Sequence, residues 1–369
     1  MSTDDAILLT GFPSYVARRA CREILRTRAD ARIYLLHALG EKAAAEDFRS
    51  QLESPDKERI TLLGGDVSYM DLGLPSGQYR GLVEELTEVQ HLASRYGAGG
   101  LSESLKRVNV NGTREVIELA GQCQRLKRLV HWSTVQVSGS RKGVVLEDEL
   151  ARGQRFRNAY ERTRFEAERL VGRAARKLPV TVLRTGIIVG DSTTGELEQY
   201  EGPHQLVARF VEARREKPIL LPGSGEAPVH LVPIDFVVAA ACHLSVDEQA
   251  IGRTYHLVDP SPLPAHMVYQ LIARKAHRQP TPQSLPTAVS RLLRLSSRIG
   301  RLTPFPIVPP EIFDHMVFYN CQNTVAALAR TDVRCPPFGQ YVEQLVGFVS
   351  EASLHHRSKV EEQFVDPLA

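Results

Sequence analysis

The chain has 369 residues, of which 43% are hydrophobic, so it can form a sizeable core and does not have the composition of a mainly disordered protein. Its 46 Lys and Arg residues nearly balance its 43 Asp and Glu residues, and a net charge of +3 argues against a nucleic-acid-binding surface. Five scattered cysteines without a CxxC pair are typical of reduced thiols, and neither they nor the twelve histidines show the spacing of metal ligands.

The apolar runs predict a cytoplasmic protein without an integral membrane segment. The first run leads straight into a glycine turn and does not have the pattern of a secretory signal. The longest later stretch, residues 236–244, is far shorter than the ~20 residues that a membrane span needs.

The first half of the chain alternates short apolar strands with helical patterns. Strands are predicted at residues 6–10, 31–39, 59–67, 88–94, 128–137 and 179–190, with a further strand at 254–259. Helices are predicted between them at residues 16–26, 42–52, 79–88, 105–123 and 158–178. Because apolar strands and helices alternate strictly, we predict an α/β fold: a doubly wound parallel sheet with helices on both faces.

The second half is less regular, and its proline and glycine content rises. We predict a dinucleotide-binding domain over residues 1–195, to which residues 230–260 return. A smaller substrate-binding cap is predicted from residues 196–229 and 261–350, and a frayed polar tail over residues 351–369.

Three features of the second half carry predictions of their own. Asp235, in the stretch "HLVPIDF", is expected to cap the helix from residue 236 rather than to act as an acid. Residues 288–305 alternate Leu and Ile with Arg, which leaves open an amphipathic lid, a membrane-surface helix or an ordinary cap helix with a basic face. Apolar, proline-rich sequence around residues 303–318 favours an apolar pocket over a sugar-nucleotide site.

The turn after the first strand is a candidate anion site, because the start of the following helix presents free N–H groups and the positive end of the helix dipole. Gly11 keeps the turn position of a G-x-x-G-x-x-G spacing, whereas Ser14 and Ala17 stand where its second and third glycines would fall. Ser14 adds a side chain near the phosphates, and Pro13 removes one N–H. On this motif alone, a dinucleotide site and a merely structural turn both stay open.

Further motifs follow this turn in a fixed order. Asp66 and Val67 come just after the third strand, Ala93 ends the fourth, and Asn109 lies in the next helix. Ser133 and Thr134 end the fifth strand, and Tyr160 and Arg164 lie one turn apart on one helix face. Each of these residues has an ordinary structural interpretation when it is taken alone, as a turn former, a helix cap or a solvated side chain.

Taken together, the motifs between residues 6 and 260 resemble the extended short-chain dehydrogenase/reductase superfamily, and within it the male-sterility branch of fatty acyl-CoA reductases and thioester reductases. In that family a Ser or Thr, a Tyr and a Lys carry the chemistry. The resemblance implies these roles for Thr134, Tyr160 and Arg164, with Ser133 as the fallback hydroxyl. It implies a dinucleotide across the carboxyl ends of the strands, contacted by Gly11, Phe12, Pro13, Ser14, Tyr15, Ala17, His37, Asp66, Val67, Ala93, Asn109, Thr185, Gly186 and Ile187.

The chain departs from the family pattern at two positions besides the glycine turn. The Y-x-x-x-K motif reads Tyr160 to Arg164, and a planar guanidinium differs from a compact ammonium. Catalysis should therefore be slower if Arg164 points inward and absent if it points to solvent. His37 stands where NAD-binding chains usually carry an acid, which favours NADP slightly over NAD, since His37 with Arg18 or Arg19 could meet a 2′-phosphate.

The resemblance implies an NAD(P)-dependent oxidoreductase of lipid metabolism that reduces an acyl thioester or another apolar carbonyl compound. Two alternatives stay open. Ser14 and Arg164 are compatible with a catalytically impaired Rossmann protein that acts as a cofactor sensor or complex subunit, and the fold is compatible with a nucleotide-sugar epimerase or dehydratase. The resemblance also implies a homodimer through two helices, one of them at residues 158–178.

Overall fold

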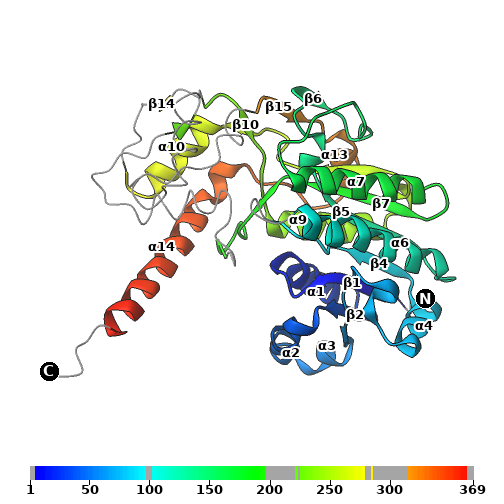
Figure 1. Cartoon of the computed structure of the whole chain (residues 1–369). Helices are drawn as coiled ribbons and strands as arrows, with labels where there is room; N and C mark the ends of the chain where they lie inside the picture. The colour runs from blue at the N-terminus through cyan, green and yellow to red at the C-terminus, as the bar shows by residue number, and fades with distance from the viewer. Residues whose placement is uncertain are drawn as a thin grey trace.

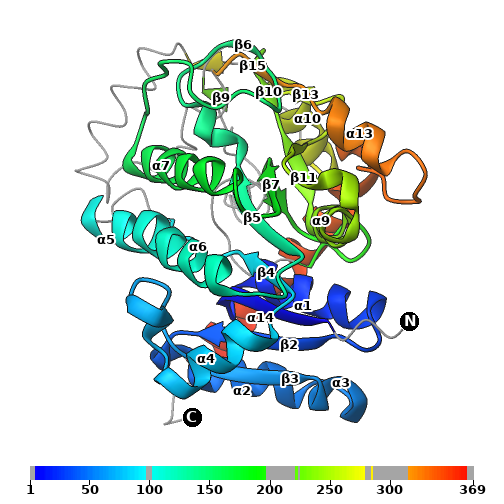
Figure 2. The ribbon, with the colours of Figure 1, turned by 90° about the vertical axis from the view of Figure 1, so that its right-hand side faces the viewer.

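The computed structural model of the chain describes residues 5–96, 102–196, 221–222, 225–278, 284–285 and 315–363. At its centre lies a parallel sheet in the order β12-β7-β5-β4-β1-β2-β3 (Figures 1 and 2). Its strands are β1 (Ala6–Phe12), β2 (Arg32–His37), β3 (Ile60–Gly64), β4 (Glu88–His91), β5 (Arg128–Thr134), β7 (Val180–Thr185) and β12 (Thr254–Leu257). The predicted doubly wound α/β fold is confirmed, and the strand order reverses between β1 and β4, where such sheets bind ligands.

Both faces of the sheet are buried, because its strands are apolar on both sides. In β1, Ile7 and Leu9 join one core, whereas Ala6 and Leu8 join the other. The first core is covered by α1 (Tyr15–Thr27), α2 (Lys42–Ser50) and α9 (Ile234–Val246). The second is covered by α4 (Ser76–Glu85), α6 (Gly112–Gln122) and α7 (Ala159–Ala174), and Figure 2 shows α6 and α7 side by side across the sheet from α9.

Smaller elements extend from the carboxyl edge of the sheet. Four two-stranded sheets pair β8 (Ile187–Val189) with β11 (Leu231–Pro233), β6 (Gly143–Val145) with β15 (Val317–Tyr319), β10 (Pro228–Val229) with β13 (Leu263–Pro264), and β9 (Leu221–Pro222) with β14 (Ser284–Leu285). The remaining α-helices are α3 (Ser54–Glu58), α5 (Ser102–Lys106), α10 (Ala265–Lys275), α13 (Gln322–Leu328) and α14 (Phe338–Gln363). The first half of α14 packs on α10 in a third apolar core, separate from the two that cover the faces of the main sheet. Figure 1 shows the second half of α14 pointing away from the rest of the fold.

Several predicted boundaries are wrong, each for a local reason. The predicted strand at 128–137 ends at Thr134, because the Thr134 hydroxyl accepts a hydrogen bond from the Gln136 N–H and starts a 3-10 turn over Val135–Ser138. The predicted strand at 179–190 divides at Gly186, where the His230 carbonyl would lie 2.7 Å from a Cβ, and β8 leaves the main sheet. The predicted helix at 105–123 divides into α5, a π-turn over Arg107–Asn111 and α6.

Two predictions for the second half are also wrong. Asp235 does not cap the helix that follows it: α9 already begins at Ile234, and the Asp235 carboxylate instead accepts from the N–H and hydroxyl of Ser192, at 2.8 and 2.6 Å. The expected frayed tail is helical up to Gln363. Residues 288–305 lie outside the described residues, and in the described part no helix is long and apolar enough to cross a bilayer.

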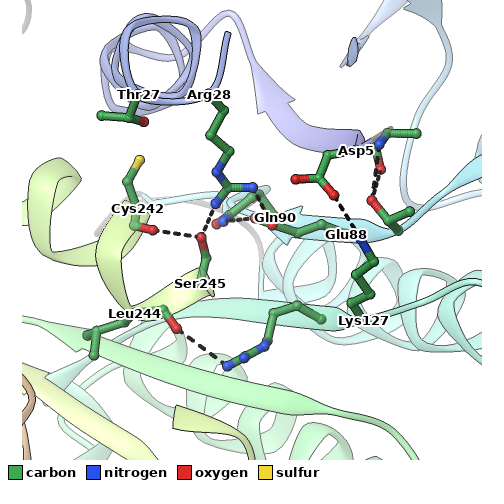
Figure 3. Close-up of polar contacts among 12 residues, drawn as sticks. Asp5, Thr27, Arg28, Glu88, Gln90, Lys127, Cys242, Leu244 and Ser245 are labelled. Carbon is green, nitrogen blue, oxygen red and sulfur yellow. Dashed lines mark hydrogen bonds and ion pairs between the residues drawn. The ribbon is translucent and has the colours of Figure 1, made fainter. Parts of the chain in front are cut away.

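A buried polar network joins α1, α9 and the sheet at the amino ends of the strands (Figure 3). Arg28, at the end of α1, forms an ion pair with Glu88 of β4 at 2.6 Å and donates to Ser245 of α9. Glu88 also accepts from Gln90, whose amide oxygen accepts from the Trp132 indole N–H at 2.7 Å. The network leads from the far edge of the sheet to the residue before Ser133, and so helps to fix the strand that carries the predicted catalytic hydroxyls.

Gly11, near the end of β1, lies directly against the backbone of Leu92 and Ala93, which follow β4. Its φ of +80° is one that L side chains rarely adopt, and an added Cβ would lie 2.7 Å from the Ala93 backbone nitrogen. The fold itself therefore requires this glycine, whether or not a ligand binds.

We expect Gly11→Ala to destabilise the protein by more than about 1 kcal/mol, because it adds both backbone strain and a clash with backbone atoms. Gly81, inside α4, has nothing within 4 Å of an added Cβ. Gly81→Ala should instead stabilise by about 0.5–1 kcal/mol. Urea unfolding of both variants measures the difference, and equal effects would contradict this account of Gly11.

Candidate active site

The turn at the start of α1 retains the features of an anion site. Ser14 is exposed, and its hydroxyl accepts from the Ala17 N–H at 3.4 Å, so it caps the helix beneath it. The N–H groups of Tyr15 and Val16, in the same first turn, have no partner within the helix. Phe12, by contrast, is 1% exposed and packs edge-on against Phe48, so only its backbone is available to a ligand.

The residues predicted for the adenosine end lie at the carboxyl ends of β2 and β3. His37 is buried, and its Nδ1 lies 2.9 Å from the Ala38 carbonyl oxygen. Asp66 is half-buried, and its Oδ1 accepts from the N–H and hydroxyl of Ser68, while its Oδ2 has no partner among the described residues. Val67 is buried, and its side chain would touch a Cβ at Gly112, which draws α6 close to this turn.

The segment 191–196 lies against the first turns of α1. Arg19 is ion-paired with Asp191 and with Glu196, and the Tyr15 hydroxyl donates to the Glu196 carbonyl at 2.9 Å. Although burial acts to raise the pKa of Asp191, hydrogen bonds from Thr193 and Arg19 overcome it and hold that pKa at about 2. Arg19, one of the two arginines considered for a 2′-phosphate, is thus already paired with two carboxylates.

The two hydroxyls at the end of β5 have different surroundings. Ser133 is buried and donates to Glu168 of α7 at 2.6 Å. Thr134 accepts from the Gln136 N–H at 3.3 Å, a contact that leaves its own hydroxyl proton free to bond a ligand. Of the two candidates, Thr134 is therefore the hydroxyl that can hold a substrate oxygen.

Tyr160 and Arg164 lie in the first turns of α7, which packs on β5 and on the 3-10 turn after Thr134. Tyr160 is half-buried, and its ring meets Tyr96 edge-on, with 4.9 Å between the centroids. Arg164 points inward: it is 2% exposed and donates through Nη2 to the Trp132 carbonyl. The sequence left open whether this arginine faces the core or solvent, and the structure places it in the core.

The remaining predicted residues lie at or beside the carboxyl ends of β4, β5 and β7. Asn109 is fully buried and joins Arg95, in the loop after β4, to Thr163 of α7 through three hydrogen bonds of 2.7 to 3.1 Å. Thr185 donates to the Ser133 carbonyl at 3.3 Å, and Ile187 donates its N–H to the His230 carbonyl at 2.8 Å. Asn109 therefore positions the loop and helix beside Tyr160.

Sequence reasoning missed a chain of buried polar contacts beneath Ser133. Glu168 forms an ion pair with Arg184 of β7 at 2.6 Å, and Arg184 Nη1 lies 3.0 Å from His256 Nε2 in β12. Both members of the ion pair are at most 3% exposed. The signal was present in the sequence, since an arginine in the middle of the apolar strand "VTVLRT" must find a partner in the core.

These residues fit a nicotinamide dinucleotide. The capped start of α1 suits a pyrophosphate, the unpartnered Asp66 Oδ2 suits an amino group, and two buried nitrogens of Arg164, Nε and Nη1, have no partner among the described residues. Within the same described ranges, no three His, Cys, Asp or Glu side chains gather as a metal site.

The sheet order, the anion site at its switch point and the Tyr–Arg pair beside β5 define a Rossmann-type nucleotide-binding protein. A sequence profile of the family described as male sterility protein, a family of NAD-binding domains, matches residues 9–241. The chain belongs to this family, within the extended short-chain dehydrogenases/reductases, and the family supports a nicotinamide-dependent oxidoreductase.

Individual relatives agree with this assignment. One component of the linear gramicidin synthase of Brevibacillus parabrevis is 27% identical over 269 residues, which are 69% of this chain and 5% of that protein. Fatty acyl-CoA reductase wat of Drosophila melanogaster is 26% identical over 279 residues, which are 64% of this chain and 53% of that protein. The crystal structure of the terminal R domain from the myxalamid PKS-NRPS biosynthetic pathway has a TM-score of 0.78 and 28% identity, and the match covers 96% of this chain and 91% of that one.

We expect Glu168→Gln to lower the free energy of unfolding by about 3–5 kcal/mol, because it leaves the buried Arg184 charge without a counter-ion. The exposed pair of Lys42 and Glu46, 3.6 Å apart, is the matched control. Glu46→Gln should change that free energy by less than about 1 kcal/mol. Urea unfolding at neutral pH compares them, and losses of similar size would mean that the buried pair has no special role.

Stability should fall as the pH drops below about 6.5, the usual pKa of histidine. Burial and the nearby Arg184 lower the pKa of His256 to about 3, and burial and Arg164 do the same for His91. Between those values the unfolded chain binds more protons than the folded one, so each histidine removes about 1.4 kcal/mol per pH unit. Unfolding free energies measured from pH 7.5 to 4.5 should show this slope.

His256→Gln should make that slope shallower, because the amide can still bond Arg184 and Asn320 but does not titrate. His277→Gln, at an exposed position, is the control and should keep the wild-type slope. A slope that is the same in all three proteins would contradict the assignment to buried histidines.

Proposed function

We propose that the protein is an NAD(P)-dependent reductase in which Tyr160, Thr134 and Arg164 act on the carbonyl group of an acyl thioester or another apolar compound. The observation that carries this proposal is the inward placement of Arg164 behind Tyr160. An arginine that had lost its ancestral role on a surface helix would be expected to turn toward solvent. Here the guanidinium is buried against the backbone of β5, one residue from the two candidate hydroxyls.

Each of these side chains has a separate role in the proposed reaction, which follows from its position. The Thr134 hydroxyl donates to the substrate carbonyl oxygen and holds it at the end of β5. Tyr160 acts as the general acid that delivers a proton to the same oxygen. The Arg164 charge lies one helical turn behind the phenol and stabilises the negative charge that develops on the phenol oxygen during the transfer. Ser133, bonded to Glu168, supports the strand and takes no direct part.

The chain's own groups hold the cofactor along the carboxyl edge of the sheet. The first turn of α1, with Gly11, Ser14 and Ala17, takes the pyrophosphate, and Asp66 and Val67 take the adenine. The reduced nicotinamide, when bound, supplies the hydride. Thr185, Gly186 and Ile187 line its expected place beside β7. We propose NADP over NAD, because His37 does not repel a 2′-phosphate as an acidic side chain would.

The substrate proposal rests on the relatives and on the cap segments at residues 196–229 and 261–350. One relative is a fatty acyl-CoA reductase, and another belongs to the linear gramicidin synthase and is far longer than this chain, which spans only 5% of it. An acyl group carried as a thioester is compatible with both. We further propose that the enzyme acts in the cytoplasm and pairs as a homodimer through α7, an arrangement that chromatography with light scattering tests.

The main alternative is a cofactor-binding protein without turnover, and Arg164 is the feature that favours it. The permanent charge and planar fork of a guanidinium do not reproduce the ribose contact or the proton exchange of an ammonium. Under this alternative the nicotinamides bind, but no carbonyl compound is reduced.

We expect calorimetric titration to detect NADPH, and more weakly NADH, and turnover assays to find reduction of an acyl-CoA or an apolar aldehyde. Tyr160→Phe should lower kcat at least 100-fold while cofactor affinity changes little, because only the proton donor is lost. Arg164→Lys should raise kcat. Binding of a nicotinamide without any turnover supports the alternative of a cofactor-binding protein. If neither NADPH nor NADH binds, both the reductase and the cofactor-binding alternative are excluded.

A further inference from the structure

Two neighbouring side chains in the core have polar atoms without partners. Arg164 bonds the Trp132 carbonyl through Nη2, but its Nε and Nη1 are buried and without a hydrogen-bond partner in the described part of the chain. His131 is 0% exposed, and within the same residues neither of its ring nitrogens has a partner. Because a buried polar atom without a partner is costly and rare in folded proteins, four such atoms in one place need an explanation.

The two side chains lie on the same face of the sheet. His131 directly precedes Trp132 in β5 and is paired in register with His91 of β4. The His91 and His131 rings are 5.4 Å apart, and His91 reaches Thr113 of α6, so both rings face the layer that contains α6 and α7. Arg164 reaches the same stretch of β5, because its Nη2 donates to the carbonyl of Trp132, the residue after His131. Burial first, and then the charge of Arg164, lower the pKa of both histidines.

Both imidazoles are therefore neutral, and a neutral imidazole has one nitrogen that accepts a hydrogen bond. In His91 both nitrogens are occupied, by Thr10 at 2.9 Å and by Thr113 at 3.0 Å. His131 alone of the pair still has its acceptor available. The unpartnered groups are thus complementary: donors on Arg164 and an acceptor on His131.

The carboxylate nearest to Arg164 is already in use. Both nitrogens that Arg184 directs at Glu168 bond its Oε1, at 2.9 and 2.6 Å, and Ser133 bonds its Oε2 at 2.6 Å. Tyr160, the other titratable group beside the guanidinium, provides a phenol that the proposed reaction needs for the substrate. Among the described residues, His131, in the sheet beneath Arg164, has a ring acceptor that no other group uses.

We propose that His131 is a positioning residue for Arg164: its imidazole accepts a hydrogen bond from Nε or Nη1, directly or through one buried water, and so holds the guanidinium beside Tyr160. An ammonium is compact and has all its donors on one nitrogen, whereas a guanidinium spreads five N–H donors over three. An arginine at this place therefore needs an acceptor that a lysine would not need. The role of His131 in catalysis rests on the proposed function, but its bond to Arg164 does not.

The bond is tested first in the protein without cofactor. His131→Phe keeps the ring and removes the acceptor, and it should lower the folding equilibrium constant at least tenfold in the wild-type background. In the Arg164→Lys background the same change should lower it less than threefold. If the imidazole has no bonded partner, replacing it with a phenyl ring removes an unsatisfied polar group and should not destabilise the protein. An unchanged or higher folding equilibrium constant in the wild-type background therefore overturns the proposal. Equal losses in the wild-type and Arg164→Lys backgrounds overturn it as well.

If His131→Phe does not fold, two milder variants decide the question. His131→Asn retains an acceptor oxygen and should keep most of the wild-type stability, whereas the similarly sized His131→Leu should not. The difference should disappear with Arg164→Lys. Should Asn and Leu be equivalent with Arg164 in place, the hydrogen bond to His131 is refuted.

The consequence for catalysis has its own readout. His131→Phe should lower kcat at least tenfold with KM changed less than threefold, and it should move the alkaline limb of the rate profile to higher pH, since the positive charge no longer sits beside the phenol. His131→Asn should restore both. A kcat loss without that shift in the profile marks a purely structural role. If the wild-type protein reduces no substrate, the proposed function fails. The stability measurements with and without Arg164→Lys still test the hydrogen bond between His131 and Arg164.

Discussion

The buried ion pair between Glu168 and Arg184 is the interaction on which the arrangement of the site depends. It joins α7, which carries Tyr160, to β7, and through Ser133 it also fixes the end of β5. Because a charge inside the core must keep its partner, neither α7 nor the two strands can shift without exposing one of these groups. The pair continues to His256 in β12 and, through the backbone of Glu147, to the segment around β6. The tyrosine and the threonine are therefore held by the same set of contacts.

The site differs from the family pattern in a way that the surrounding core accommodates. Arg164 replaces a lysine, yet the side chain stays inward, where its Nη2 donates to the Trp132 carbonyl. Ser14 replaces a glycine, yet its hydroxyl caps α1 by accepting from the Ala17 N–H. Both substitutions keep the charge distribution of a dinucleotide site: helix N–H groups at one end of the crevice and a cation behind the tyrosine at the other.

Much of the fold and part of the site could be predicted from the sequence. The strands of the main parallel sheet were recognisable because each is a short apolar run bounded by turn residues, and this pattern needs no long-range information. The wrong predictions lie where the contact of a single side chain ends an element or redirects a residue. β5 ends at Thr134 because of one side-chain cap, and Asp235 bonds a loop more than forty residues away rather than its own helix. Contacts of that kind depend on which segments meet in space.

The sequence by itself determined the family and the class of cofactor, and it predicted the threonine, tyrosine and arginine of the site, because motif order and spacing along a βα repeat place residues at one edge of the sheet. Only the tertiary structure decided the direction of each side chain: Arg164 into the core, Ser133 toward Glu168, and Arg19 toward Asp191. Side-chain direction follows from burial and from the partners available at each place. Those partners come from elements as distant in sequence as α1 and the segment after β8.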